Sequence, residues 1–176
     1  MSLNNITLVG LRSAGKSTIG KALATKLNLK FIDADIAVEQ LYYKQTGALI
    51  PFRELHEKIG ATKFRQLVSV AIKDLCTNNQ NILIAAGGGS LLEQANVDYF
   101  KSCSKIVFLD ASYELLLERW EQHPPKFIMQ NNIVQELRDY YNHRRPLFNS
   151  LADVCVSVDN KTIQEIACEI VERLFL

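Results

Sequence analysis

Short apolar runs alternate with longer segments of helical periodicity along nearly the whole chain. The apolar runs are rich in β-branched residues and predict strands at Ile6–Val9, Lys30–Ile32, Ile82–Ala86, Ile106–Leu109 and Val154–Val158. Between them, apolar residues recur at helical spacing, which predicts helices at 16–28, 35–45, 52–76, 91–101, 112–121, 133–143 and 162–175. The last helix begins with Thr162 and Glu165 at the spacing of a capping box.

Strands that are apolar along their whole length are covered on both faces, which is typical of a parallel sheet between two helical layers. Parallel strands need helical crossovers, and the segments between the apolar runs are long enough to supply them. Because the chain contains no repeat or linker, we predict one domain over residues 1–176 with a three-layer α/β/α fold. Ligands of such folds bind at the carboxyl ends of the strands.

Composition narrows the classes of function without selecting one. Hydrophobic residues make up 48% of the 176 positions and charged residues 22%, which is ordinary for a globular domain. The net charge of +1 gives no indication of a nucleic-acid or membrane partner, and no apolar run approaches the roughly 18 residues of a membrane span. The four cysteines are widely spaced, which predicts reduced core thiols in a cytoplasmic protein rather than a disulfide framework or zinc site.

The most specific motif directly follows the first predicted strand. Residues 10–18 read Gly-Leu-Arg-Ser-Ala-Gly-Lys-Ser-Thr, which fits the phosphate-binding pattern G-x-x-x-x-G-K-[ST] at a strand-to-helix turn. Gly10 and Gly15 allow the close backbone approach by which main-chain N–H groups point at phosphate oxygens. We expect Lys16 to reach the β and γ phosphates of a nucleoside triphosphate and Ser17 to bind Mg²⁺. The alternative is a glycine turn that binds no ligand.

Two further segments follow predicted strands and could carry chemistry. Asp33 and Asp35 follow the second strand, where one carboxylate can hold Mg²⁺ through water while the other accepts a proton from a substrate hydroxyl. Alternatively, Asp35 caps the next helix. Gly87, Gly88 and Gly89 follow the third strand, where the backbone either lies flat against a ligand or the phosphate-binding loop, or forms a flexible turn.

The basic and irregular segments leave more than one interpretation open. Arg65, Arg144 and Arg145 could together bind a carboxylate or phosphate, although a single arginine is usually a solvated surface residue. The histidines show no metal-ligand spacing. Residues 121–132 contain two adjacent prolines and a polar tail, which indicates either a plain surface loop or a lid over the nucleotide.

The ordered set of the phosphate-binding loop, Asp-x-Asp, Phe64-Arg65 and Gly-Gly-Gly resembles the shikimate kinases over essentially the full length. The resemblance implies a P-loop kinase fold with a five-stranded parallel sheet of order 2-3-1-4-5, substrate-binding helices at about 35–76 and a lid at about 121–132. It also implies transfer of the γ-phosphoryl group of ATP, with Mg²⁺, to the 3-hydroxyl of shikimate. The product would be shikimate 3-phosphate, in the biosynthesis of chorismate and the aromatic amino acids.

The resemblance also implies a role for each matching residue. Lys16 contacts the transferred phosphoryl group, Asp35 binds the shikimate hydroxyls and serves as base, and Asp33 holds the metal with Ser17. The nucleotide-binding positions are Gly10, Ser13, Ala14, Gly15, Lys16, Ser17, Thr18 and, against the adenine, Arg119. The substrate-binding positions are Asp35, Arg65, Gly87, Gly88, Gly89 and Arg144, and Lys126 is the catalytic cation of the lid.

The sequence departs from the family pattern at three positions. Lys126 stands where the lid usually has arginine, Val68 stands where a glutamate usually orients Arg65, and His56 replaces a common phenylalanine. Two alternative functions therefore stay open: a related kinase for another small hydroxy acid or polyol such as gluconate, and a nucleotide-binding module with little or no turnover. We expect a monomer that binds ATP and a small-molecule substrate, and no nucleic acid or membrane.

Overall fold

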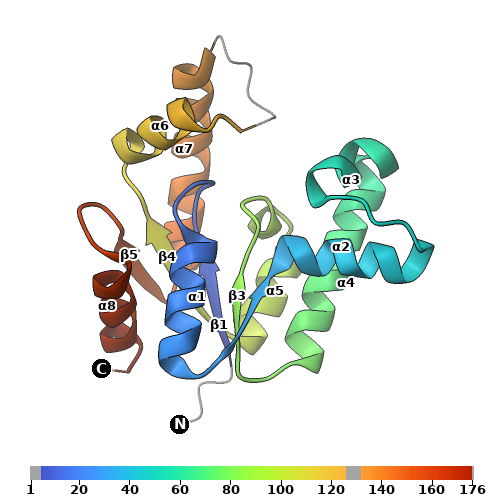
Figure 1. The fold of residues 1–176 in the computed structure, drawn as a ribbon, viewed down its shortest axis with the longest axis horizontal. Coiled ribbons are helices and arrows are strands. Elements are labelled where there is room, and N and C mark those ends of the chain that lie inside the picture. Colours follow the sequence, from blue (N-terminus) through green and yellow to red (C-terminus); the bar gives the residue numbers. More distant parts are fainter. Residues whose placement is uncertain (1–4, 126–131, 176) are drawn as a thin grey trace.

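The fold is an alternation of helices and strands, and the computed structural model describes residues 5–125 and 132–175 (Figure 1). In chain order the elements are β1 (Asn5–Val9), α1 (Lys16–Leu27), β2 (Lys30–Asp33), α2 (Ala34–Thr46), α3 (Phe52–Ile59), α4 (Ala61–Asn78), β3 (Ile82–Ala85), η1 (Ser90–Leu92), α5 (Gln94–Cys103), β4 (Lys105–Asp110), α6 (Tyr113–Gln122), α7 (Ile133–Leu151), β5 (Val154–Ser157) and α8 (Ile163–Phe175).

The strands form one parallel sheet in the order β2-β3-β1-β4-β5, which confirms the expected topology. β1 lies at the centre, where Thr7 pairs with Ile84 of β3 and with Ile106 of β4. Because β1 and β3 are apolar and neighbouring, every residue of both strands is buried. The loops that follow β1, β2 and β3 therefore meet at one edge of the sheet.

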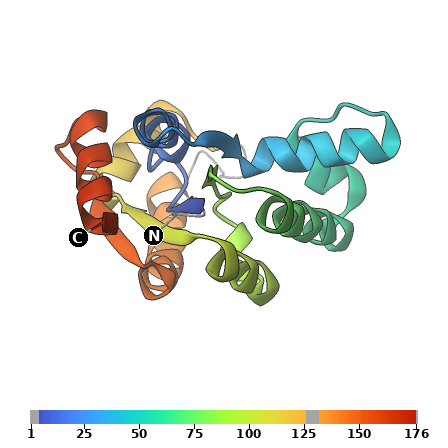
Figure 2. The same ribbon diagram turned by 90° about the horizontal axis from the view of Figure 1, so that it is seen from below.

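Helices cover both faces of the sheet, as the near-continuous apolar strands predict. Figure 2 shows α1 and α8 on one side of the strands and α4, α5 and α7 on the other. The largest fully buried side chains are aromatic and include Trp120, Phe100, Phe108 and Phe148. The three-layer α/β/α fold is thus confirmed. None of the described helices is both long and apolar enough to cross a membrane.

Helices α2, α3 and α4 form an arm that extends beyond the β2 edge of the sheet (Figure 1). We call residues 34–78 the helical arm. Its interior is a second, smaller apolar cluster, separate from the main core, whose buried members are Val38, Leu55, Leu67 and Ala71. The rings of Phe52 and Phe64 pack against this cluster with centroids 5.1 Å apart. The outer part of the arm therefore has an apolar cluster of its own, whereas Ala34, Ile72 and Leu75 join the main core.

Three predicted helix boundaries are wrong. The helix expected at 91–101 begins only at Gln94, after the separate short helix η1. The helix expected at 52–76 is broken at Gly60, whose backbone angles of φ 80° and ψ 156° are incompatible with a continuous helix. The helix expected to end at residue 143 continues through Pro146 to Leu151. Proline costs one helical hydrogen bond, and burial of Phe148 against Phe108, with ring centroids 5.8 Å apart, offsets that cost.

The four cysteines are free thiols, and their placement differs from the prediction of core positions. Cys76, Cys103 and Cys155 are partly exposed, and Cys168 is exposed. Cys155 lies on β5, the edge strand of the sheet, where an apolar sequence pattern does not guarantee cover on both faces.

Candidate active site

The loop between β1 and α1 is shaped by two glycines. Gly10 has φ 154°, and a Cβ on this residue would lie only 2.8 Å from the Leu109 carbonyl oxygen of the neighbouring strand. Gly15 has φ 94° and is the residue that precedes the first turn of α1. Both positions therefore require glycine, one for its close approach and the other for its left-handed backbone. The loop ends with the N-terminus of α1, where unpaired N–H groups favour an anion.

Lys16 turns back into this loop. Its ammonium donates hydrogen bonds to the carbonyl oxygens of Gly10 at 2.9 Å and Leu11 at 3.0 Å. Loss of solvent lowers the pKa of Lys16 to about 8, although the carboxylates of Asp35 and Asp33 act in the opposite direction. The ammonium is thus held by the loop, where the charges of the two carboxylates act on it, and a cation in a phosphate-binding loop suits phosphoryl transfer.

Helix α6 braces the loop from one side. The Arg119 guanidinium donates to the Ser13 carbonyl oxygen at 2.6 Å, and the Trp120 indole N–H donates to the Arg12 carbonyl oxygen at 3.4 Å. Ser13 adopts a left-handed φ of 69°, which is uncommon for a residue with a side chain. The sequence interpretation treats Trp120 only as core. Its second function as a brace is recognisable only from the contact.

A cavity of about 400 Å³ adjoins the outer side of the loop. Its wall brings together four of the expected nucleotide-binding positions, Ser13, Ala14, Gly15 and Thr18, with the expected adenine-contacting residue Arg119. The opposite wall comes from the start of the C-terminal helix and the turn before it, through Val158, Lys161, Ile163 and Ile166. A pocket with apolar walls and a few convergent polar groups suits a nucleobase and ribose.

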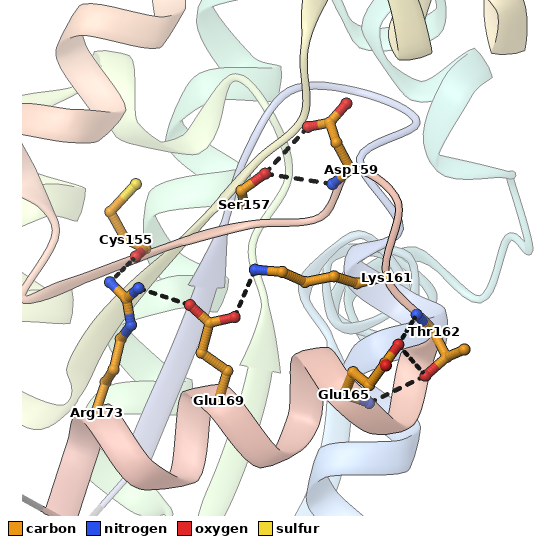
Figure 3. A network of polar contacts seen from close by, with 8 residues as sticks. All are labelled: Cys155, Ser157, Asp159, Lys161, Thr162, Glu165, Glu169 and Arg173. Carbon is orange, nitrogen blue, oxygen red and sulfur yellow. Dashed lines mark hydrogen bonds and ion pairs between the residues drawn. The ribbon is translucent and has the colours of Figure 1, made fainter.

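Polar contacts around the C-terminal helix hold the turn that forms this wall (Figure 3). Lys161 donates to Glu169 at 2.6 Å, and Glu169 also pairs with Arg173 at 2.6 Å. The predicted capping box is present, because Thr162 N–H donates to Glu165 Oε2 at 2.7 Å and Glu165 N–H donates to Thr162 Oγ1 at 3.2 Å. The wall is thus fixed by side chains close to it in sequence.

Ser17 and Asp33 form the polar pair best suited to a magnesium ion. The Ser17 hydroxyl donates to Asp33 Oδ2 at 2.8 Å, while Asp33 Oδ1 accepts from the Asp35 N–H at 3.0 Å. Asp33 is therefore the cap of α2, and the alternative that Asp35 caps this helix is wrong. A hydroxyl and a carboxylate suit Mg²⁺ that keeps several waters and phosphate ligands. The described residues contain no group of three or more His, Cys, Asp or Glu suited to a metal.

Asp35 lies in the first turn of α2 against the glycine segment that follows β3. A Cβ on Gly87 would lie 2.5 Å from Asp35 Oδ1, so glycine at this position leaves room for the carboxylate. Desolvation, followed by the charge of Asp33, raises the pKa of Asp35 to about 6, with Lys16 opposing the shift. A carboxylate with a pKa near neutrality, beside a buried cation, is equipped to accept a proton.

Gly88 is enclosed by α7. The Arg144 guanidinium donates to the Gly88 carbonyl oxygen at 2.7 Å and lies 5.2 Å from the centre of the Tyr140 ring. A Cβ on Gly88 would lie 2.7 Å from the Tyr140 hydroxyl. Close approach thus explains Gly87 and Gly88 better than a flexible turn does, whereas a Cβ on Gly89 would meet nothing within 4 Å. Tyr140 had no role in the sequence interpretation.

The adjacent arginine has a different function. Arg145 forms a two-pronged contact with Asp110, at 2.8 Å to Oδ1 and 2.6 Å to Oδ2. This hydrogen-bonded pair raises the pKa of Arg145. Its guanidinium is therefore committed to the end of β4, and Arg144 is the residue that faces the glycine segment.

Arg65, on α4, has a partner that the sequence pattern does not indicate. Its Nε lies 3.7 Å from Glu93 Oε1, in the segment between η1 and α5, and the side chains are 70% and 45% exposed. Glu93 thus supplies a carboxylate from another element, although Val68 occupies the position of the usual glutamate. Val68 itself packs between the two apolar clusters. His56 packs edge-on against Phe64, with ring centroids 5.4 Å apart.

The structure thus groups most of the predicted site residues, although not all of them. Lys16, Ser17, Asp33, Asp35, Gly87, Gly88 and Arg144 are linked by the contacts above, and Arg119 joins them through the loop. Lys126, with half of the predicted lid (residues 126–131), lies outside the described residues. Within residues 5–125 and 132–175, the side-chain contact of Arg65 is the ion pair with Glu93.

Comparison with known proteins gives one family. The family model of shikimate kinase matches residues 12–175. The shikimate kinase of Pseudomonas paraeruginosa is 35% identical over 171 residues, which cover 97% of this chain and 95% of the relative. Shikimate kinase from Acinetobacter baumannii, solved in complex with shikimate, matches with a TM-score of 0.82 and 30% identity over 98% of this chain and 93% of that chain. A gluconokinase from Sinorhizobium meliloti, with a TM-score of 0.63 and 21% identity over 98% and 91% of the two chains, is similar in fold alone.

Proposed function

This chain belongs to the shikimate kinase family of ATP-dependent phosphotransferases, and we propose that it transfers the γ-phosphoryl group of ATP to the 3-hydroxyl of shikimate. The products are shikimate 3-phosphate and ADP, in the biosynthesis of chorismate and the aromatic amino acids. One observation carries the proposal most directly. Lys16 is hydrogen-bonded to the phosphate-binding loop and is affected by the charge of Asp35, while Asp35 lies against Gly87 at the start of the segment that Arg144 contacts.

On the nucleotide side, we assign the triphosphate to residues 10–18 and the adenine to the 400 Å³ cavity beside Arg119. Main-chain N–H groups of the loop and the ammonium of Lys16 bind the β and γ phosphates. Ser17 and Asp33 would hold Mg²⁺, which would neutralise part of the phosphate charge. The hydrogen bond of 2.8 Å between these two side chains supports this assignment, because it brings both oxygens to one point.

On the acceptor side, we assign Asp35 as the group that accepts the hydroxyl proton. Its raised pKa, about 6, supports this role because the carboxylate is ionised at neutral pH and still basic enough to take a proton. Arg144 and Arg65 bind the carboxylate of the acid, with the backbone of Gly88 beside it. Two guanidinium groups both neutralise a small carboxylate and fix its orientation. The helical arm and Lys126 complete the acceptor site and the lid in this proposal.

The gluconate alternative gains no support beyond fold, because the gluconokinase is only 21% identical to this chain. The alternative of a module without turnover is opposed by the intact set of Lys16, Ser17, Asp33 and Asp35. The four free thiols fit a reducing compartment such as the cytoplasm. A monomeric state without nucleic-acid or membrane partners stays a prediction.

An ADP-release assay tests the function directly. Purified protein with MgATP is given shikimate, gluconate or no acceptor, and the phosphorylated product is identified by phosphorus NMR and mass spectrometry. We expect ADP release that depends on shikimate and yields the 3-phosphate. ADP release that shikimate does not increase, or that gluconate increases more, would overturn the proposal.

A further inference from the structure

Tyr140 lies on α7, four residues before Arg144, and neither the sequence motifs nor the assignments above give it a role. It is partly buried and packs against the main apolar core. Residues four apart share one face of a helix, so Tyr140 and Arg144 project from α7 toward the same side. On this side lie Trp120, which braces the phosphate-binding loop, and Gly88 of the glycine segment.

The ring of Tyr140 is anchored to the core. It packs against the Trp120 ring, with centroids 5.6 Å apart and ring planes inclined by 45°. Trp120 is itself fully buried, and its indole N–H donates to the Arg12 carbonyl oxygen of the phosphate-binding loop at 3.4 Å. A tyrosine side chain has few rotatable bonds, and packing against a buried ring restricts them further. Tyr140 is therefore a fixed surface for the groups that contact it.

Arg144 lies on this surface. Its guanidinium carbon is over the Tyr140 ring, 5.2 Å from the centroid, and its Nη1 donates to the Gly88 carbonyl oxygen at 2.7 Å. A single hydrogen bond leaves the guanidinium free to turn about that bond, whereas an aromatic face attracts the cation and restricts its plane. The ring and the carbonyl oxygen together thus fix both the place and the orientation of the guanidinium. Its remaining N–H donors suit a carboxylate that binds in the plane of the fork.

The Tyr140 hydroxyl acts on the glycine segment. A Cβ on Gly88 would lie 2.7 Å from the hydroxyl oxygen. Apart from Gly88 and its chain neighbours, no other heavy atom of the described residues would lie within 4 Å of that Cβ. Gly88 does not have a positive φ, so its backbone conformation would accept another residue. The hydroxyl is therefore what excludes a side chain at this position.

We propose that Tyr140 is a positioning residue of the acceptor site. Its ring holds the Arg144 guanidinium in the orientation that binds the carboxylate of the acid, and its hydroxyl limits how closely the Gly88 backbone approaches. The inference rests on the proposed function, which places Arg144 and Gly88 at the acceptor. Because Tyr140 acts through these two residues rather than on the reacting atoms, its loss should weaken acceptor binding more than it affects ATP or kcat.

Two substitutions separate the ring from the hydroxyl. Tyr140→Phe keeps the ring and removes the hydroxyl, whereas Tyr140→Leu removes both. Tyr140→Met, with a longer apolar side chain, replaces Tyr140→Leu if the latter does not fold. Tyr113→Leu is the matched control, because Tyr113 is a partly buried tyrosine of α6 with the guanidinium of Arg138 over its ring, 5.6 Å from the centroid. Thermal unfolding of each variant shows whether it is folded.

For Tyr140→Leu we expect the KM of shikimate to rise about tenfold, while the KM of ATP and kcat change less than about twofold. Tyr140→Phe should keep the KM of shikimate within about threefold of the parent, because the ring stays. Tyr113→Leu should lower the unfolding midpoint and leave both KM values unchanged. A folded Tyr140→Leu variant in which both KM values rise equally, or in which neither rises, overturns the positioning role.

A double-mutant cycle tests the hydroxyl without any ligand. Gly88→Ala in the parent places a methyl group against the Tyr140 hydroxyl, and we expect the unfolding midpoint to fall by about 5 °C. In the Tyr140→Phe background the hydroxyl is gone, so the same substitution should lower the midpoint by less than about 1 °C. An equal decrease in both backgrounds overturns the effect of the hydroxyl on Gly88.

The orientation of Arg144 can also be measured without an acceptor. Its Nε–H resonance in a nitrogen–proton correlation spectrum is assigned by its loss in Arg144→Ala. The ring current at position 140 should shift this resonance upfield in the parent and in Tyr140→Phe, and the shift should disappear in Tyr140→Leu. If the parent protein does not turn over shikimate, the proposed function fails, and this resonance still decides the role of Tyr140. A resonance that Tyr140→Leu leaves unchanged overturns that role.

Discussion

The nucleotide half and the acceptor half of the site are held in different ways. On the nucleotide side, residues 10–18 are one continuous segment, whose carbonyl oxygens accept hydrogen bonds from Lys16, Arg119 and Trp120. On the acceptor side, the groups come from separate elements: Asp35 from α2, the glycine segment after β3, Arg144 from α7 and Arg65 from α4. The Arg65 side chain is 70% exposed, and its ion pair with Glu93 is long, at 3.7 Å.

Substitutions should therefore have different effects in the two halves. The nucleotide half is a single preorganised unit, so loss of its central cation should affect turnover as a whole. Each acceptor group, in contrast, is positioned by its own helix or loop. Each should contribute according to how firmly its own contact holds it, and mainly to acceptor affinity.

The most severe test of the nucleotide half is Lys16→Met. We expect kcat to fall about 1000-fold, because the ammonium inside the loop stabilises the charge of the moving phosphoryl group. Lys21→Met, an exposed lysine of the same helix, is the matched control and should keep full turnover. Steady-state kinetics give kcat for both variants, and thermal unfolding shows whether each is folded. A folded Lys16→Met variant that keeps normal turnover would remove the loop from the mechanism.

On the acceptor side, Asp35→Asn should have the largest effect. We expect kcat to fall about 100-fold because the amide cannot accept the hydroxyl proton. The folded-state pKa of Asp35, about 6, lies above the ordinary value of 3.8, so the ionised carboxylate disfavours the folded state at pH 7. The midpoint of thermal unfolding at pH 7 should therefore rise in the variant. Lower stability together with normal turnover would contradict both statements.

Arg144→Ala should mainly raise the KM of the acceptor acid. We expect an increase of about 10- to 100-fold, with little change in the KM of ATP, because the variant loses a charge-assisted contact to a carboxylate. The neighbouring Arg145→Ala is the control. Arg145 pairs with Asp110, so its loss should lower stability without a specific effect on the acceptor. Equal increases in both KM values for Arg144→Ala would place this arginine outside the acceptor site.

The pH dependence of kcat/KM tests both halves at once. Activity should rise as pH increases through about 6, where Asp35 loses its proton, and fall above about 8, where Lys16 loses its charge. Well below the lower pKa and well above the higher one, kcat/KM should change about tenfold per pH unit. In Lys16→Arg, the residual activity should lack the alkaline decline, because arginine stays protonated. An alkaline decline at the same pH in that variant would assign it to another group.

The smallest effect is expected for Glu93→Gln. Its ion pair with Arg65 is long and exposed, and such pairs contribute little energy. We expect the KM of the acceptor to rise about two- to threefold, with kcat unchanged. In an Arg65→Met background the same substitution should have no effect, because the partner is gone. An effect that persists there would mean that Glu93 acts independently of Arg65.

Local sequence was sufficient for the fold class and the phosphate-binding loop. Residues 10–18 form a contiguous motif, whereas Ser17 meets Asp33 only because β3 pairs with both β1 and β2, so that the carboxyl ends of these parallel strands share one edge of the sheet. The near-continuous apolar strands required helices on both faces. The break at Gly60 and the continuation of α7 through Pro146 could not be predicted from the local pattern. The positive φ of Gly60 and the burial of Phe148 depend on packing as well.

The acceptor half was decided by tertiary structure. The sequence could not distinguish Arg144 from Arg145, yet one contacts Gly88, which lies 56 residues earlier, and the other pairs with Asp110. The contacts of Glu93 and Tyr140 were equally hidden from the sequence. The physical reason is that such contacts form only when α4, α6 and α7 pack around the sheet, whereas backbone geometry within one loop is set by the residues of that loop.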